Sequence, residues 1–382
     1  MPHESWHTQD FPEFRERRPW VMQEMIESEP ALAEPVLTDP AASTLGDMVR
    51  SATGAGGPVA VVGCGTSEHG AMAVAEQITE ALGGRATAHP RQAFEAMLDP
   101  WGSGACIGIS HEGGTAATVA AIESARTAGA TVGLITAVAD SAGAKAADHA
   151  LVTPLRDRSW CHTVGYVSPI LGGAAVAQAL SGSTVDAAEA ARALAVTPEA
   201  HQRIREVAAA LFGVTRYLPV GSGADRIAAR ELALKIEEGV RVPATARELE
   251  TILHGHWVAQ DEGAAVILLM TDPRQANARA ERASQMLRAA REIGARTAAI
   301  LTESTEGLLG PEDLPDDRIV VPAPTGLPAS TASLLASAPA LQLLTLELVH
   351  LGGVNPDLIR REDAPYREAA AIAESAFPSA RG

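Results

Sequence analysis

Residues 59–67 read VAVVGCGTS, an apolar run that ends in two glycines and two hydroxyl side chains. Such a run is typical of a strand that is buried on both faces of a parallel sheet. A stretch of helical length, Gly70 to Leu82, follows it. Glycines let a backbone approach an anion closely, and the start of a helix offers amide donors and a positive dipole end. The turn at Gly63 to Ser67 therefore predicts either a phosphate site or a tight turn without ligand.

The same pattern returns later in the chain. Val62-Gly63-Cys64-Gly65 is matched by Val220-Gly221-Ser222-Gly223, and residues 125–130 are matched by residues 290–295 at a similar spacing. We therefore expect a duplicated α/β domain. The expected organisation is a leading helix within residues 1–44, a first domain at 45–190, a second domain at 191–351 and a tail at 352–382.

Short apolar runs rich in Val and Ile alternate with Ala-rich stretches of helical length, which is typical of α/β layering with parallel strands. The expected strands are Val59 to Val62, Cys106 to Ile109, Val132 to Ile135, Leu151 to Leu155, Leu218 to Val220, Val266 to Met270, Ala298 to Leu301 and Ile319 to Pro322. Helices are expected at Pro19 to Ala33, Ala117 to Ala128 and Val185 to Leu211, besides the one after Ser67.

Charge and cysteine content limit the partners and the setting. The formal net charge is -17, which repels nucleic acid and anionic membranes unless a local basic patch intervenes. The longest apolar runs, such as Ala264 to Met270, are far shorter than the ~20 residues that span a bilayer. Cys64, Cys106 and Cys161 form no CxxC pair, which favours a reducing, cytoplasmic setting. The histidines show no metal-ligand spacing, so we expect no metal.

A second loop of hydroxyls and glycines, Ser110-His111-Glu112-Gly113-Gly114-Thr115, follows the next expected strand and opens the next expected helix. Open α/β sheets bind ligands at the carboxyl ends of their strands. Two such loops on adjacent parallel strands would meet at one edge of the sheet. Together they favour a phosphorylated ligand.

The segment 231–238, ELALKIEE, carries a third candidate group. On a helix, Lys235 and Glu238 share a face, so the cation can hold the carboxylate in position. The same spacing also fits an exposed ion pair on a solvated helix face. Only Lys145 and Lys235 are lysines among the 30 basic residues, which suggests that a lysine is specifically needed at position 235.

These segments resemble the double sugar-isomerase (SIS) domain family, which includes the isomerase half of glucosamine-6-phosphate synthase and aminosugar-phosphate deaminases. The resemblance runs in family order from about Trp20 to Asp357. The matching pieces are Gly63 to Ser67, Ser110 to Thr115, His162-Thr163, Glu231 to Glu238, His254-Gly255 and Gly353 to Asp357. It implies two tandem SIS domains, each a three-layer sandwich with a parallel sheet.

The resemblance also implies roles for individual residues. Glu238 would be the base that moves a proton between C1 and C2, with Lys235 as its neighbour. His254 would open the sugar ring from the other subunit of a homodimer with a shared active site, although nearby His256 competes for this assignment. The implied binding residues are Gly65, Thr66, Ser67, Ser110, His111, Glu112, Gly113, Thr115, His162 and Thr163. A carboxylate and an imidazole suffice for enolisation, so no cofactor is expected.

Three departures from the family pattern bear on substrate and reaction. Glu112 stands where the family usually has a serine that contacts phosphate, and a carboxylate there repels phosphate unless it turns away or is protonated. Gly114 replaces the usual glutamate. No lysine follows Lys235, whereas the synthase has one near its C-terminus; Arg360 and Arg361 are nearby but cannot form a Schiff base. The chain starts Met1-Pro2 without a cysteine nucleophile, so glutamine-dependent synthesis is not expected.

We therefore expect an enzyme that acts on an aminohexose 6-phosphate by ring opening and C2 proton abstraction. A free amine leads to isomerising deamination, with loss of ammonia and formation of fructose 6-phosphate. An N-acetylated amine favours a dehydratase, which expels the C3 hydroxyl as water. A third alternative is a sugar-phosphate sensor that binds without turnover.

Overall fold

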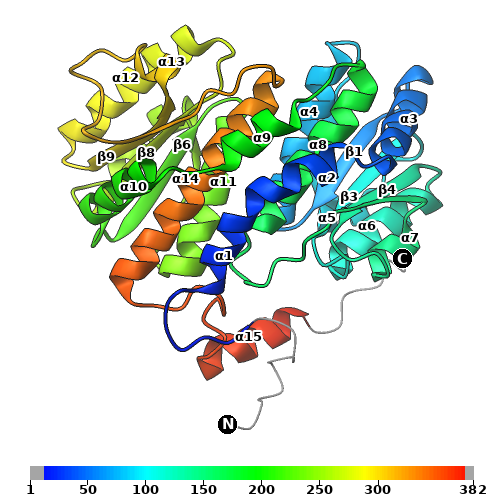
Figure 1. Cartoon of the computed structure of the whole chain (residues 1–382), viewed down its shortest axis with the longest axis horizontal. Helices are drawn as coiled ribbons and strands as arrows, with labels where there is room; N and C mark the ends of the chain where they lie inside the picture. The colour runs from blue at the N-terminus through cyan, green and yellow to red at the C-terminus, as the bar shows by residue number, and fades with distance from the viewer. Residues whose placement is uncertain (1–12, 375–382) are drawn as a thin grey trace. The chain divides into compact units, whose positions relative to one another are not determined.

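The computed structural model describes residues 13–374, which fold into two compact units, each with one five-stranded parallel sheet (Figure 1). The first unit comprises Ser28–Asp157, His162–Ala191 and the chain from Arg361 onward. The second comprises the chain up to Glu27, Arg158–Cys161 and Arg192–Arg360. The α/β class and the two parallel sheets are confirmed. Neither unit is continuous in sequence, and the domain limits at 44, 190 and 351 stay a prediction.

The sheet of the first unit has the strand order β2-β1-β3-β4-β5, and all neighbouring strands are parallel. Its strands are β1 (Val59–Gly63), β2 (Ala88–Gln92), β3 (Ala105–Ile109), β4 (Thr131–Thr136) and β5 (His149–Val152). Every residue of β1 and β3 is buried, as expected for central strands that helices cover.

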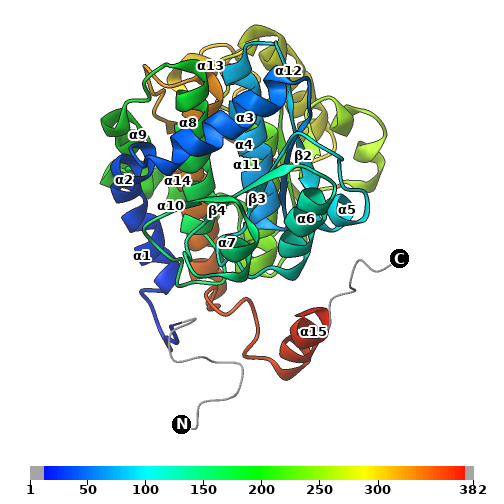
Figure 2. The ribbon, with the colours of Figure 1, turned by 90° about the vertical axis from the view of Figure 1, so that its right-hand side faces the viewer.

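Helices contact both faces of this sheet. A Cβ on Gly108 of β3 would lie 3.0 Å from Ile122 in α6, whereas a Cβ on Gly70 of α4 would lie 3.2 Å from Ile109. Because successive strand residues point to opposite faces, α4 and α6 cover opposite sides. Helices α4 and α8 pack together, and α5 packs on α6 (Figure 2). The helices of this part are η1 (Glu29–Leu32), α2 (Ala33–Leu37), α3 (Ala41–Gly54), α4 (Thr66–Leu82), α5 (Ala93–Leu98), α6 (Ala116–Thr127), α7 (Ala142–Ala146), α8 (Val164–Ser181) and α15 (Ala364–Glu374).

The sheet of the second unit has the order β10-β9-β8-β6-β7 and is also parallel throughout. Its strands are β6 (Arg216–Gly221), β7 (Arg247–Glu248), β8 (Ala264–Met270), β9 (Arg296–Thr302) and β10 (Asp317–Val321). The remaining helices are α1 (Val21–Ser28), α9 (Ala187–Leu194), α10 (Pro198–Leu211), α11 (Asp225–Lys235), the π-helical turn η2 (Ile236–Val240), η3 (Thr251–Leu253), η4 (His256–Ala259), α12 (Ala276–Glu292), α13 (Glu303–Glu306) and α14 (Ala329–Gly352).

The two sheets repeat one topology, since β6 to β10 follow the same order as β1 to β5. The repeated glycines have the same structural reason in both units. A Cβ on Gly63 would lie 2.2 Å from the carbonyl oxygen of Ser67, and one on Gly221 would lie 2.3 Å from that of Asp225. Only glycine fits where a strand turns this tightly into a helix. This agreement supports the duplication inferred from the sequence.

Several elements differ from the prediction. Strands β2 and β7 were not expected from the sequence. Strand β2 contains Pro90 and polar residues, and β7 has only two residues. Pro30 divides the leading helix into α1, η1 and α2, and Pro198 begins α10 after a break in the connecting helix. The tail contains a helix, α15. Residues 375–382 of the predicted tail lie outside the described part.

Helices α8 and α14 are long and apolar enough to cross a membrane by length and composition alone. In the fold, 78% of the apolar window of α8 and 100% of that of α14 are buried. Burial against protein accounts for their composition, as in the core helices of α/β proteins.

Candidate active site

The first predicted loop joins β1 to α4 in the first unit. Gly65 precedes the helix with φ 57°, and Thr66 is its first residue. The N–H of Ser67 donates to the carbonyl of Cys64 at 3.1 Å, and the N–H of Glu68 donates to that of Gly65 at 2.9 Å. The loop thus closes as a tight turn whose exposed point is Gly65. The positive end of a helix of 17 residues lies directly behind it.

The second predicted loop joins β3 to α6. Strands β1 and β3 are parallel neighbours, so both loops leave the same edge of the sheet. The hydroxyl of buried Ser110 donates to that of Thr115 at 3.2 Å, and the N–H of Gly113 donates to the carbonyl of Ser110 at 3.0 Å. Gly113 has φ 63°, and a Cβ there would lie 2.1 Å from the hydroxyl of Ser141. The structure therefore places the two loops as the sequence predicts.

Glu112 of this loop forms an ion pair that the sequence did not suggest. Its Oε2 lies 2.6 Å from a guanidinium nitrogen of Arg156. Burial raises the pKa of Glu112, while the charge of Arg156 opposes that shift. Arg156 directly follows the expected strand Leu151 to Leu155, but no local spacing pairs it with position 112.

A buried network holds the segment around residue 157 to the second loop. Nε2 of His111 accepts the backbone N–H of Asp157 at 2.8 Å, so the ring carries its proton on Nδ1. Burial lowers the pKa of His111 to about 4. The Asp157 carboxylate accepts the N–H groups of Thr163 and Gly165 at 2.7 and 3.1 Å. The hydrogen bonds of His111 and Thr163 to Asp157 thus hold the backbone of this segment in place.

Asp157 is ionised in this network. Burial alone would raise its pKa, but the neighbouring imidazole of His162 and the backbone N–H of Thr163 lower it to about 2. Nδ1 of His162 lies 3.6 Å from the Asp157 carboxylate, and this side chain keeps 23% of its surface exposed. Among the predicted pair His162-Thr163, His162 is therefore the one that can reach a ligand.

The third predicted group lies in the second unit, where α11 ends. Lys235 is the last residue of α11, and Glu238 lies in the π-helical turn η2 rather than in a continuing α-helix. The Lys235 ammonium lies 2.5 Å from Oε2 of Glu238 and 3.5 Å from Oε1 of Glu231. Lys235 and Glu231 are fully buried, whereas Glu238 is 21% exposed. The reading of this pair as a solvated surface contact is therefore wrong.

The electrostatics of this cluster keep the lysine charged. Burial disfavours the ammonium, but the charges of Glu238 and Glu231 outweigh it and raise the pKa of Lys235 above its ordinary value. Glu231 was quoted in the motif but not assigned a role. Its spacing of four residues from Lys235 was the signal that could have identified it.

His254 lies at the end of η3 with 70% of its side chain exposed. Its Nε2 pairs with the Glu250 carboxylate at 2.8 Å, and Arg282 holds the same carboxylate at 2.7 Å. Buried Ile252 anchors this segment, and Val258, six residues after it, is 92% exposed. The structure thus presents His254 outward and gives it no bond to Lys235 or Glu238.

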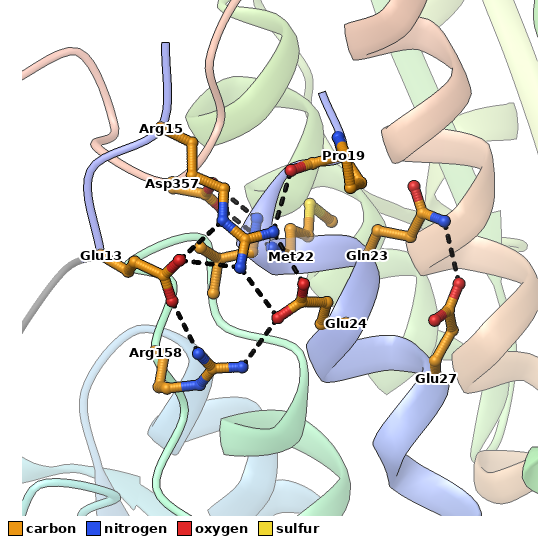
Figure 3. A network of polar contacts seen from close by, with 10 residues as sticks. Glu13, Arg15, Pro19, Met22, Gln23, Glu24, Glu27, Arg158 and Asp357 are labelled. Carbon is orange, nitrogen blue, oxygen red and sulfur yellow. Dashed lines mark hydrogen bonds and ion pairs between the residues drawn. The ribbon is translucent and has the colours of Figure 1, made fainter. Parts of the chain in front are cut away.

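The matching tail motif has a structural task within the second unit. The buried Asp357 carboxylate accepts the N–H groups of Val21 and Met22 at 2.9 Å, which satisfies the start of α1. Burial raises the pKa of Asp357. Beside it, Arg15 and Arg158 share the carboxylates of Glu13 and Glu24 (Figure 3). In the described part of the chain, no three His, Cys, Asp or Glu side chains are grouped as metal ligands.

Comparison with known proteins agrees with this fold. The SIS domain family matches residues 57–171. Glutamine–fructose-6-phosphate aminotransferase (isomerizing) of Clostridium acetobutylicum is 28% identical over 229 residues, which are 56% of this chain and 36% of that protein. The aligned part thus spans about a third of the length of this relative.

Three solved structures share the fold. The C-terminal domain of glucosamine-fructose-6-phosphate aminotransferase from Francisella tularensis aligns with TM-score 0.72 and 15% identity, over 89% of this chain and 98% of that one. Tagatose-6-phosphate ketose/aldose isomerase of Escherichia coli aligns with TM-score 0.68 and 19% identity, over 89% of this chain and 95% of that one. Glucosamine-6-phosphate deaminase of Thermotoga maritima aligns with TM-score 0.65 and 18% identity, over 88% of this chain and 97% of that one. Residues 57–171 of the chain thus match the SIS domain family, and the solved structures extend the likeness in fold to both units.

Proposed function

We propose that the chain is an enzyme that moves or removes the C2 proton of a hexose 6-phosphate, with Glu238 as the base. The contact between Lys235 and Glu238 carries this proposal. A fully buried ammonium holds a carboxylate that solvent, and hence a ligand, can reach. The π-helical turn η2 continues α11, and such turns are rare and occur frequently at functional sites, which also supports the assignment.

For an aminohexose 6-phosphate the chemistry would proceed in three steps. Ring opening gives an aldehyde at C1 and makes the C2 proton acidic. Glu238 takes that proton, and the resulting enolamine is protonated at C1, which yields a ketose imine. Water adds to the imine carbon and ammonia leaves, so that the net reaction converts aminohexose phosphate and water into ketose phosphate and ammonia. The name of the structurally similar glucosamine-6-phosphate deaminase supports an aminosugar substrate.

Ring opening is assigned to His254 of a second subunit. An imidazole can both donate a proton to the ring oxygen and accept one from the C1 hydroxyl. The outward position of His254 beside exposed Val258 supports a contact with another copy of the chain. The substrate phosphate is assigned to the loops at Gly65 to Ser67 and Ser110 to Thr115.

One experiment separates the candidate reactions. Purified protein is incubated in deuterated water with glucosamine 6-phosphate and, separately, with its N-acetyl form. Release of ammonia from the first supports the deaminase, and loss of water from the second supports the dehydratase. Deuterium at C2 without either product supports proton transfer alone. Thermal stabilisation by these ligands with neither exchange nor product would support a non-catalytic sensor and overturn the enzyme proposal.

A further inference from the structure

An ion pair joins Glu112 of the second loop, at the position where the family resemblance implies a serine, to Arg156. Oε2 of Glu112 contacts the guanidinium at 2.6 Å, and the two side chains are 30% and 46% exposed. The other carboxylate oxygen, Oε1, is buried and has no hydrogen-bond partner within residues 13–374. Arg156 is therefore the single ion-pair partner of Glu112 in the described chain.

The neighbouring groups do not replace this guanidinium. Asp157, next to Arg156 in sequence, is fully buried and ionised, and it adds a second negative charge. His111 is buried and neutral. His162 is near enough to favour the ionised form of Glu112, but less strongly than Arg156 does. Without Arg156, Glu112 would keep the repulsion from the charge of Asp157 with no guanidinium to offset it.

We propose that Arg156 is a positioning residue which neutralises Glu112 and thereby lets this loop accept a phosphate dianion. The inference rests on the proposed function, in which the loop holds the phosphate of the sugar. Like charges held close together in a partly desolvated site repel each other strongly. An arginine that bridges to the carboxylate removes this repulsion and keeps the loop open to an anionic ligand.

The proposal predicts a specific pattern in a double-mutant cycle. Arg156→Ala should weaken binding of glucosamine 6-phosphate by about tenfold or more, because it leaves Glu112 unpaired. Arg156→Lys keeps the charge and should retain most of the affinity. Glu112→Ser/Arg156→Ala removes both charges and should bind within about threefold of the parent protein. Such recovery is the signature of coupled residues.

Titration calorimetry in a Glu238→Gln background measures these affinities without consuming the ligand. Unphosphorylated glucosamine is the comparison ligand, whose binding should not follow the pattern. Arg126→Ala is the matched control, because Arg126 pairs with Asp148 at 2.6 Å with similar exposure. Arg126→Ala removes one cation from the same unit, at a position outside the loop, and it should leave the affinity unchanged.

Either of two affinity results would overturn the proposal. Unchanged affinity in Arg156→Ala would show that the pair does not matter. If Arg156→Ala and the double variant bind glucosamine 6-phosphate equally weakly, Arg156 contacts the phosphate directly instead. If the parent protein binds no hexose phosphate, the proposed function fails, and thermal stabilisation by inorganic phosphate tests the pair alone. The same pattern of thermal stabilisation by inorganic phosphate across the variants would support the role of Arg156. No stabilisation of the parent protein by phosphate would overturn that role.

Discussion

Lys235 is fully buried, yet the carboxylate it holds at 2.5 Å, Glu238, keeps a fifth of its surface exposed. The junction between α11 and the π-helical turn produces this arrangement. A cation that cannot exchange with solvent fixes a carboxylate that can meet a ligand. Such preorganisation is what a general base needs, because its position is set before the substrate arrives.

Glu238→Gln keeps size and polarity but removes the proton acceptor. Turnover should fall by roughly 10² to 10⁴, while substrate affinity changes little. Exchange of the C2 hydrogen in deuterated water, followed by NMR, should vanish as well. Glu237→Gln is the control in the same turn, since that side chain accepts the N–H of Ala244 instead. Near-normal exchange in Glu238→Gln would move the base elsewhere, with His254 and Glu250 as the next candidates.

Lys235→Met tests the buried cation separately from catalysis. The substitution removes the buried ammonium that lies 3.5 Å from the fully buried Glu231 carboxylate, so the free energy of unfolding should fall by about 3 to 5 kcal/mol. Adding Glu231→Gln removes this buried negative charge and should restore part of that loss. Urea unfolding of the three proteins measures both effects. Equal stability of Lys235→Met and the parent would mean that the ammonium does not compensate Glu231.

Val258→Glu tests whether the segment beside His254 contacts another subunit. Val258 is 92% exposed, and a charge there should oppose burial in a dimer interface. We expect the dimer fraction in light scattering and the activity to fall together. Leu98→Glu, at another exposed apolar position, should change neither. A fully active monomer, in either the parent or the variant, would refute the shared site.

Treatment with EDTA tests the expectation that enolisation here needs no metal. A carboxylate and an imidazole supply the required proton transfers, so activity should persist after chelation and dialysis. Activity assays before and after chelation measure this. Loss of activity that a divalent ion restores would contradict the proposed mechanism.

The sequence predicted the fold well where burial dictates the residues. The central strands β1, β3, β6 and β8 are apolar runs because helices cover both of their faces, and Gly63 and Gly221 repeat because the same tight turn repeats. The edge strand β2 escaped prediction because an edge tolerates Pro90 and polar residues, which carry no strand signal.

The candidate site could be predicted only where a local motif carried it. Lys235 and Glu238 lie within one turn, so their contact follows from spacing even though the turn is π-helical. Arg156 meets Glu112, and Asp157 meets His111, through tertiary packing between segments more than forty residues apart. No periodicity links such segments. Side-chain burial, which made Lys235 a buried cation and His254 an exposed imidazole, likewise depends on packing.

His111 gives the first unit a defined sensitivity to acid. Burial lowers its folded-state pKa to about 4, whereas an unfolded histidine titrates near ~6.5. Between these values the unfolded chain binds a proton that the folded chain does not. Unfolding free energy should therefore decrease as the pH falls through this window, by about 1.4 kcal/mol per pH unit for the single proton.

His111→Gln removes this proton but keeps an acceptor for the N–H of Asp157. The variant should be less stable than the parent at pH 7.5, and the difference should shrink by about 3 kcal/mol between pH 7 and pH 4. The pKa of Asp157 is lowered to about 2, so its own loss of stability begins below pH 4 and does not overlap this window. Urea unfolding at half-unit pH steps measures both curves. Parallel curves from pH 7 to 4 would show that His111 is protonated equally in the folded and unfolded chains.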